Sequence, residues 1–207
     1  AEVPAVTSSP APETAEEIRE NVEQDLDQDG APDKVDITVD EEAYTTLVSG
    51  TIASGVYTDL VEQALMGAKY FCRDTEAGDG FVELYVTGDT ASDDYMTCVY
   101  RLENGRLRRA EIYNEVVSCD GRGHVTATAH VNVLGTWGGS CDYKLMPDFT
   151  FALDSPYTIL RYDGDYAERK LTTRLFGLPV RPVDGGQETV NLPEGTELFP
   201  TATDQNA

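Results

Sequence analysis

The chain has 207 residues, a formal net charge of −23 and 40% hydrophobic residues. This charge argues against binding to nucleic acid or to an anionic membrane surface, because both rest on Lys and Arg. No run approaches the roughly 20 apolar residues that cross a bilayer, and the length suffices for one substantial core. We therefore expect a monomer without a membrane-inserted segment.

The N-terminal segment, residues 1–14, is rich in small residues, Pro and Ser and has no apolar periodicity. Such a composition is typical of a flexible tether that remains after an export or lipoprotein signal has been removed. We expect an extracellular or bacterial cell-surface protein with an N-terminal lipid anchor. A short helix is predicted over residues 14–24, where Thr14 and Glu17 form a capping box.

Residues 25–33 place a carboxylate at every second position, continue with a glycine and return to a carboxylate at the ninth position. Calcium takes six to eight oxygen ligands, so this DxDxDGxxD pattern predicts a Ca²⁺ site. The expected ligands are the carboxylates of Asp25, Asp27, Asp29 and Asp33 and the carbonyl of Ala31. The alternative is a polar turn, but residues 1–42 hold fourteen acidic and two basic residues, whose repulsion a cation would relieve.

The residues after the loop distinguish two structures that share this motif. An EF-hand or dockerin continues with a helix and uses the twelfth loop residue, here Asp36, as a ligand. Val35, Ile37 and Val39 instead alternate with polar residues, which predicts a strand. The loop thereby resembles those of FG-GAP or VCBS-type β-propeller repeats and of related secreted or lipoprotein-type β-domains of gut Firmicutes.

Further segments extend this resemblance over residues 23–150. Residues 90–95, the turn at 119–123 and residues 134–137 follow one another in the order and spacing of those secreted proteins. The resemblance implies a calcium-loop β-domain, and no reaction comes with it.

Most of the remaining chain predicts strands separated by turns. After the strand at 35–40, they are expected over residues 44–49, 69–72, 81–87, 95–102, 107–113, 125–129, 134–137, 141–145, 149–153 and 171–175. A helical face over residues 59–67 interrupts the series. Asn104-Gly105 is a strong signal for a type I′ hairpin turn. Four strands in a meander have the content of one propeller blade.

The predicted fold class is all-β, either propeller-like or an open antiparallel β-meander with the calcium loop. The expected organisation is a tether at residues 1–14, a β-rich domain at 15–175 and a C-terminal extension at 176–207. Within that extension, residues 188–199 are similar to the opening strand and turn of an SH3-like module. The alternative is that this segment pairs as an edge strand.

Two charge clusters accompany the central strands. Asp74, Asp79 and Glu83 suggest a second, degenerate acidic loop, with a solvated turn as the alternative. Arginines gather around the Asn104-Gly105 turn at positions 101, 106, 108 and 109. They dock an acidic partner or the protein's own acidic N-terminal segment, or they form ion pairs on an exposed hairpin.

The four cysteines are Cys72, Cys98, Cys119 and Cys141. They include no CxxC pair and so indicate neither a zinc ribbon nor a thioredoxin-type site. An even number in an extracellular calcium-loop protein favours disulfides, and we expect Cys72 with Cys98 and Cys119 with Cys141. The alternative is four buried free thiols.

No GxSxG, HExxH, P-loop or GxGxxG motif is present, which argues against catalysis. The sequence predicts a non-catalytic binding module with a structural calcium ion and an extracellular protein or glycan as partner. The alternative is an extracellular glycan or peptide hydrolase that uses two carboxylates in a cleft.

Overall fold

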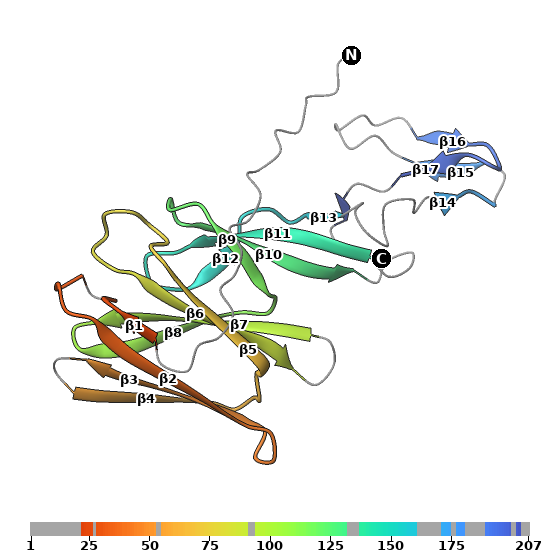
Figure 1. Ribbon diagram of the computed structural model, residues 1–207. Helices are drawn as coiled ribbons and strands as arrows, with labels where there is room; N and C mark the ends of the chain where they lie inside the picture. The colour runs from red at the N-terminus through yellow and green to blue at the C-terminus, as the bar shows by residue number, and fades with distance from the viewer. Residues whose placement is uncertain are drawn as a thin grey trace. The chain divides into compact units, whose positions relative to one another are not determined.

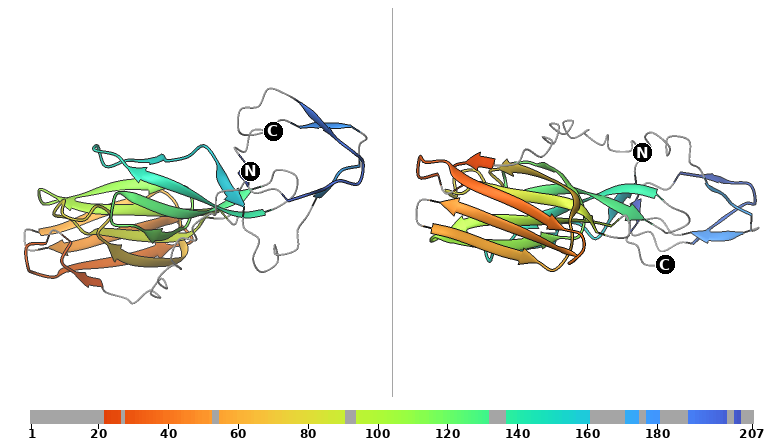
Figure 2. Two further views of the ribbon diagram at one scale, coloured as in Figure 1. Left: turned by 90° about the horizontal axis from the view of Figure 1, so that it is seen from above. Right: turned by 60° about the horizontal axis from the view of Figure 1, so that its bottom comes forward.

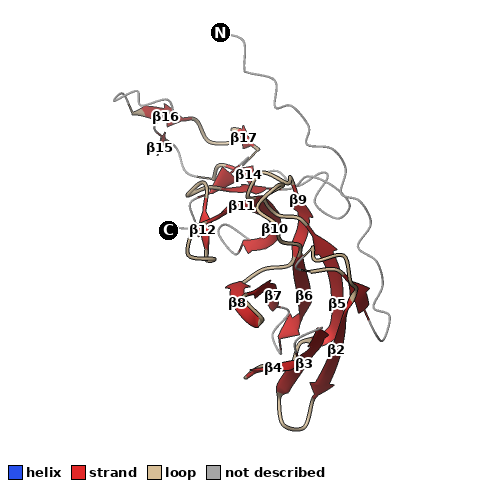
Figure 3. Ribbon diagram, turned by 90° about the vertical axis from the view of Figure 1, so that its left-hand side faces the viewer, coloured by secondary structure: helices blue, strands red, loops and turns tan. Residues whose placement is uncertain are grey.

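The computed structural model describes residues 22–26, 28–52, 55–90, 94–131, 137–160, 171–174, 177–180, 189–199 and 202–203. Within these residues every regular element is a strand, and every strand pairing is antiparallel. Figure 1 follows the strands along the chain, and Figure 3 shows red strands and tan loops with no blue helix. The described part of the chain therefore has no helix that could span a membrane. The predicted all-β class is confirmed.

Sheet 1 contains four strands in sequence order. They are β1 (Val22–Gln24), β2 (Asp33–Asp40), β3 (Thr45–Ile52) and β4 (Gly55–Val61). In β2 the side chains of Val35, Ile37 and Val39 join the core, while the intervening polar residues face outward. The strand that we predicted after the acidic loop is thus confirmed, because its two-residue period matches one buried face.

Sheet 2 is a four-stranded meander. Its strands are β5 (Met66–Arg73), β6 (Glu83–Thr90), β7 (Asp94–Glu103) and β8 (Arg106–Ile112). The β7–β8 turn has positive φ at both Asn104 (52°) and Gly105 (68°), as the predicted type I′ hairpin requires. Edge strands β4 of sheet 1 and β8 of sheet 2 approach each other.

Both predicted helices are wrong within the described residues. Residues 22–24 form β1 and pair with β2, and the rest of the segment 14–24 that precedes them lies outside the described residues. In the segment 59–67, β4 continues to Val61 and β5 begins at Met66. The side chains of Val61, Ala64 and Leu65 are buried in the core although the residues between β4 and β5 form no helix, because tertiary packing overrides a short helical pattern.

Sheet 3 follows the order β18-β13-β11-β10-β9, and β12 also pairs with β11. Its strands are β9 (Val116–Cys119), β10 (His124–Val131), β11 (Trp137–Leu145), β12 (Phe151–Leu153), β13 (Thr158–Leu160) and β18 (Ala202–Thr203). Contacts divide the chain into unit 1, residues 1–129 with 141–155, and unit 2, residues 130–140 with 156–207. The predicted boundary at residue 175 stays a prediction.

Unit 1 is a stack of three layers. One core cluster fills the space between sheets 1 and 2, with Val48 from β3 and Tyr100 from β7 among its members. A second cluster covers the opposite face of sheet 2, where Tyr85 and Val99 pack with Val125 of β10. Figure 2 (left) shows the central sheet between the other two layers. Because both of its faces are covered, β6 is buried along most of its length.

Unit 2 contains two further two-stranded sheets. They pair β14 (Leu171–Thr172) with β17 (Glu197–Leu198) and β15 (Leu178–Val180) with β16 (Val190–Leu192). Residue 188 of the predicted tail segment 188–199 lies outside the described residues, and the rest of the segment pairs within unit 2 through β16 and β17. Strand β18 forms the edge of sheet 3 beside β13. The expected SH3-like module stays a prediction.

Open antiparallel sheets are confirmed, since sheets 1 and 2 are meanders and no sheet in the described ranges closes into a barrel. The meander β5–β8 has the strand content of a propeller blade, but in unit 1 the neighbouring sheets stack on its two faces. The described residues therefore give the propeller alternative no support.

Candidate functional site

The acidic loop joins β1 to β2, and its carboxylates organise its backbone. Asp25 accepts hydrogen bonds from the backbone N–H groups of Asp29 (3.0 Å) and Gly30 (2.9 Å). Asp29 accepts one from Ala31 (2.8 Å). Gly30 has φ +91°, a conformation that a side chain would strain. The N–H groups of three successive residues therefore donate to loop carboxylates, which holds the backbone in a tight turn.

Asp33 closes the loop at the first residue of β2. Its side chain is buried at 4% exposure, and its Oδ2 accepts the backbone N–H of Leu26 at 2.9 Å. Leu26 is itself buried in the core between sheets 1 and 2, and its carbonyl accepts the N–H of Val82 at 3.0 Å. A further bond joins the Gln28 side chain to the Phe81 carbonyl at 3.1 Å. The acidic loop is thus anchored to the loop that leads into β6.

The donor set of this loop fits a hard cation, since it offers carboxylate and carbonyl oxygens without nitrogen or sulfur ligands. Asp27, one of the predicted ligands, lies outside the described residues. Without it, no three acidic, His or Cys side chains of the described ranges are grouped as a metal site. Lys34, the nearest basic residue in sequence, pairs with Asp36 at 3.6 Å, and Asp25 pairs with no Lys or Arg of the described chain. Asp36 lies in strand β2, so the EF-hand arrangement does not apply.

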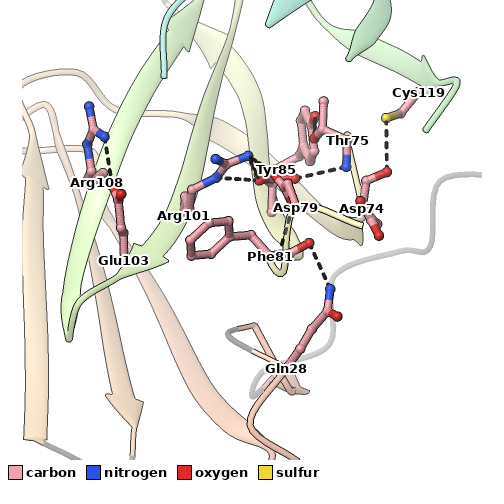
Figure 4. A network of polar contacts seen from close by, with 11 residues as sticks. Gln28, Asp74, Thr75, Asp79, Phe81, Tyr85, Arg101, Glu103, Arg108 and Cys119 are labelled. Carbon is pink, nitrogen blue, oxygen red and sulfur yellow. Dashed lines mark hydrogen bonds and ion pairs between the residues drawn. The ribbon is translucent and has the colours of Figure 1, made fainter. Parts of the chain in front are cut away.

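The second acidic loop is organised around an arginine. Arg101 of β7 donates from Nε to Glu83 Oε1 (2.7 Å) and from Nη2 to Asp79 Oδ2 (2.7 Å). Glu83 is fully buried, and its other oxygen accepts the N–H of Thr75 at 3.0 Å. Figure 4 shows the Arg101 guanidinium turned toward Asp79, with the Phe81 ring beneath it. Asp79 and Glu83 are therefore both paired with one guanidinium from within the protein.

Two aromatic rings enclose this guanidinium. The Arg101 Cζ atom lies 4.5 Å from the centre of the Phe81 ring and 4.8 Å from that of Phe149. Such cation–π contacts gain strength where water is excluded. Asp74, the third residue of the predicted loop, belongs to another contact: its carbonyl accepts the Sγ–H of Cys119 at 3.8 Å. The structure brings Asp79 and Glu83 together on Arg101 and leaves Asp74 outside this pair.

Three of the four clustered arginines, Arg101, Arg108 and Arg109, form ion pairs within the chain, as the second interpretation expected. Besides Arg101, Arg108 pairs with Glu103 at 2.8 Å, and Arg109 pairs with Asp59 at 2.6 Å. Their charges are compensated within the chain. A docking patch for an acidic partner therefore has no support from these residues.

The predicted disulfides are corrected by the structure, in which all four cysteines are free thiols. Cys72 lies on β5 and Cys98 on β7, with β6 between them. Cys119 on β9 and Cys141 on β11 are likewise separated by β10. Two strand spacings amount to about 9.5 Å, whereas a disulfide needs Cα atoms within about 7 Å. Burial raises the pKa of both Cys72 and Cys98 to about 12, so these thiols stay protonated and unreactive at neutral pH.

The sequence did not indicate the open pocket of about 370 Å³ where edge strands β4 and β8 meet. Its lining comes from the end of β4 and the residues after it, from β7, and from β8 and the turn after it, namely Leu60, Val61, Glu62, Gln63, Met96, Arg109, Glu111 and Tyr113. The segments from the two sheets lie about fifty residues apart in the chain, as Asp59 and Arg109 do, and only sheet packing brings them together.

Two buried threonines fix the backbone on either side of this pocket. The Thr46 hydroxyl donates to the carbonyl of Gln63 (2.9 Å) and accepts the N–H of Leu65 (2.9 Å). Thr97 does the same at the opposite rim, where it donates to the carbonyl of Asn114 (2.7 Å) and accepts the N–H of Val116 (3.2 Å). Each hydroxyl thus clamps residues two apart in the chain. The pocket rims are held by bonds that involve no exposed side chain.

Comparisons of the chain with protein-family models, with curated proteins and with solved structures find no match. The resemblance to FG-GAP or VCBS-type domains therefore stays a prediction.

Proposed function

We propose that the protein is a secreted or cell-surface, non-catalytic binding module in which the loop at residues 25–33 binds a structural calcium ion. The observation that carries this proposal is the backbone organisation of the loop. Asp25 and Asp29 accept three loop N–H groups, and buried Asp33 accepts a fourth. The loop concentrates four carboxylates within nine residues, and a bound cation would neutralise their mutual repulsion.

The residues that would hold the ion are Asp25, Asp27, Asp29 and Asp33, together with the Ala31 carbonyl. A bound Ca²⁺ would supply positive charge to a segment that anchors to both core sheets. The loop continues directly into β2 of sheet 1, and Leu26 and Gln28 bond to residues 82 and 81 ahead of β6 in sheet 2. A cation at this loop would accordingly stabilise the contact between these sheets rather than a reacting group.

The proposed location outside the cell rests on the calcium loop and on the composition of residues 1–14. The cysteines do not add to this argument, because they form no disulfides. Extracellular calcium suits a site of moderate affinity. The net charge of −23 disfavours polyanions as partners. The proposed partner is an extracellular protein or glycan.

The test is the melting temperature of the protein in excess calcium and in excess chelator. At calcium 100-fold above its Kd, binding stabilises the folded state by about 2.7 kcal/mol, which for a domain of this size raises Tm by about 5 to 10 °C. The double variant Asp27→Asn/Asp29→Asn should lose this response, because it removes two charges while it keeps side-chain oxygens that can accept the loop N–H groups.

The matched control is Asp36→Asn/Asp40→Asn, which removes the same charge from β2, outside the proposed ligand set. It should retain the calcium response of the unmodified protein. A Tm that does not differ between calcium and chelator contradicts the site. Equal loss of response in both double variants would mean that calcium acts on overall charge and binds no defined loop.

One observation favours the hydrolase alternative enough to test it. The pocket beside β8 is lined by two carboxylates, Glu62 and Glu111, and glycosidases use a pair of carboxyl groups across a cleft. Reducing-sugar release from neutral oligosaccharides should be absent in the unmodified protein. Turnover by the unmodified protein that is lost in Glu62→Gln would show that the protein is an enzyme rather than a non-catalytic binding module.

A further inference from the structure

The pocket between β4 and β8 has no part in the calcium site. Its lining residues belong to unit 1, and their side chains combine an exposed aromatic ring, aliphatic groups and hydrogen-bonding groups. We propose that this pocket binds a neutral saccharide. The inference deepens the proposed binding function and rests on it, because it names the ligand class and the surface that recognises it.

Tyr113 supplies a platform for a sugar ring. Its side chain is 71% exposed at the turn after β8, although a tyrosine normally buries much of its area. Leu60, also at the pocket, is 53% exposed. The face of an aromatic ring carries partial negative charge and attracts C–H groups such as those on the apolar face of a pyranose. The buried side chains of Val61 and Met96 complete an apolar part of the lining.

The polar part of the lining offers donors and acceptors together. Arg109 donates from Nε to Glu111 (3.1 Å) and from Nη1 to Asp59 (2.6 Å) and to the Leu60 carbonyl (3.3 Å). Its Nη2 atom makes no hydrogen bond within the described chain, and neither do the side chains of Glu62 and Gln63. A fixed guanidinium beside a carboxylate matches vicinal hydroxyls, which donate one hydrogen bond and accept another.

The charge of the pocket selects against an anionic ligand. Asp59, Glu62 and Glu111 contribute three carboxylates in or beside the pocket, against the guanidinium of Arg109, among the residues described there. An acidic sugar or a phosphate would meet this excess of negative charge without a free cation to pair with. Neutral hydroxyl groups can accept from Arg109 and donate to the carboxylates at no such cost.

The pocket is also held ready for a ligand. The Thr46 and Thr97 clamps fix its two rims, and Leu65 packs directly on Gly88, where an added Cβ would lie 2.6 Å from Leu65 atoms. Binding to a preformed site loses less conformational entropy, so that a few contacts suffice for measurable affinity. A shallow site for a small polar ligand depends on being preformed in this way.

The experiment uses the full chain on a microarray of neutral, acidic and amino-oligosaccharides, followed by calorimetric titration with the neutral oligosaccharide that gives the strongest signal. We expect saturable binding of a neutral saccharide and no binding of its uronic-acid counterpart. Tyr113→Ala should weaken binding by about tenfold or more, since it removes the platform. Glu62→Gln should also weaken it. Tyr95→Ala, which truncates an exposed tyrosine of β7 that does not line the pocket, should change Kd less than about twofold.

Recognition of acidic or amino sugars alone, no saccharide binding at all, or equal binding by Tyr113→Ala and the unmodified protein would each overturn the inference. The melting temperatures of the same samples in calcium and in chelator test the calcium site independently of the saccharide pocket. A calcium response without saccharide binding refutes the pocket assignment only. Saccharide binding without a calcium response refutes the calcium site and supports the pocket.

Discussion

Replacing Arg101 by methionine tests whether the second acidic loop is a closed ion-pair network. The Arg101 side chain is 13% exposed and reaches both Asp79 and the fully buried Glu83. Methionine keeps an apolar contact with Phe81 and Phe149 but leaves the Glu83 carboxylate buried without its cation. Removing one partner of a buried pair costs about 3 to 5 kcal/mol, so we expect a loss of unfolding free energy in that range.

A double-mutant cycle measured by urea denaturation makes this prediction sharper. In Glu83→Gln, the side-chain oxygen can still accept the N–H of Thr75, which the carboxylate binds at 3.0 Å, while the negative charge is gone. Arg101→Met in this background should cost clearly less than in the unmodified protein, with a coupling free energy of about 1 to 3 kcal/mol.

Arg106→Met is the matched control, because Arg106 lies on the same hairpin with an exposed side chain. It should change stability by less than about 0.5 kcal/mol. If Arg101→Met costs no more than this control, or if the cycle shows no coupling, the buried pair does not stabilise the fold and Arg101 is not the residue that holds the second acidic loop together.

Two further predictions concern the core. Gly88→Ala should lower the unfolding free energy by about 1 to 3 kcal/mol, because the new Cβ would lie 2.6 Å from the backbone of Leu65; an unchanged urea midpoint would contradict this contact. Burial raises the pKa of the Cys72 and Cys98 thiols to about 12, above their ordinary value of 9.0. Their contribution to stability is therefore complete below about pH 9 and falls as the pH rises toward 12, by about 1.4 kcal/mol per pH unit for each thiol. Urea denaturation between pH 7 and 11 measures this slope, which Cys98→Ala should reduce, and stability that stays level above pH 9 would refute the burial of both thiols.

Where one face of a strand is buried and the other faces water, the sequence predicted the strand correctly. The alternation of Val35, Ile37 and Val39 indicated β2, and Asn104-Gly105 indicated the β7–β8 hairpin. The predicted helix over residues 59–67 was wrong because the spacing of its apolar residues does not show which part of the protein they pack against. Val61 and Leu65 are buried by contacts with sheet 2, which lies later in the chain.

The candidate sites were predictable only in part. The acidic loop is local, since its proposed ligands lie within nine residues and the hydrogen bonds that Asp25 and Asp29 accept join residues at most five positions apart. The fate of Asp79 and Glu83 depended on Arg101, eighteen or more residues away. The prediction of the disulfides was wrong because it also depended on strand order. The spacing of the cysteines in the sequence does not show that another strand lies between the two cysteines of each pair.

The β-strand class, the hairpin turn and the acidic loop follow from the amino-acid sequence, because they depend on residues within a few positions of one another. The pairing of charges, the separation of the cysteines and the position of the pocket follow from the three-dimensional arrangement. Each of these depends on strand order and on the stacking of sheets, which place residues 59 and 109 within hydrogen-bonding distance. Side-chain period fixes which face of a strand is buried, whereas long-range packing alone fixes what that face meets.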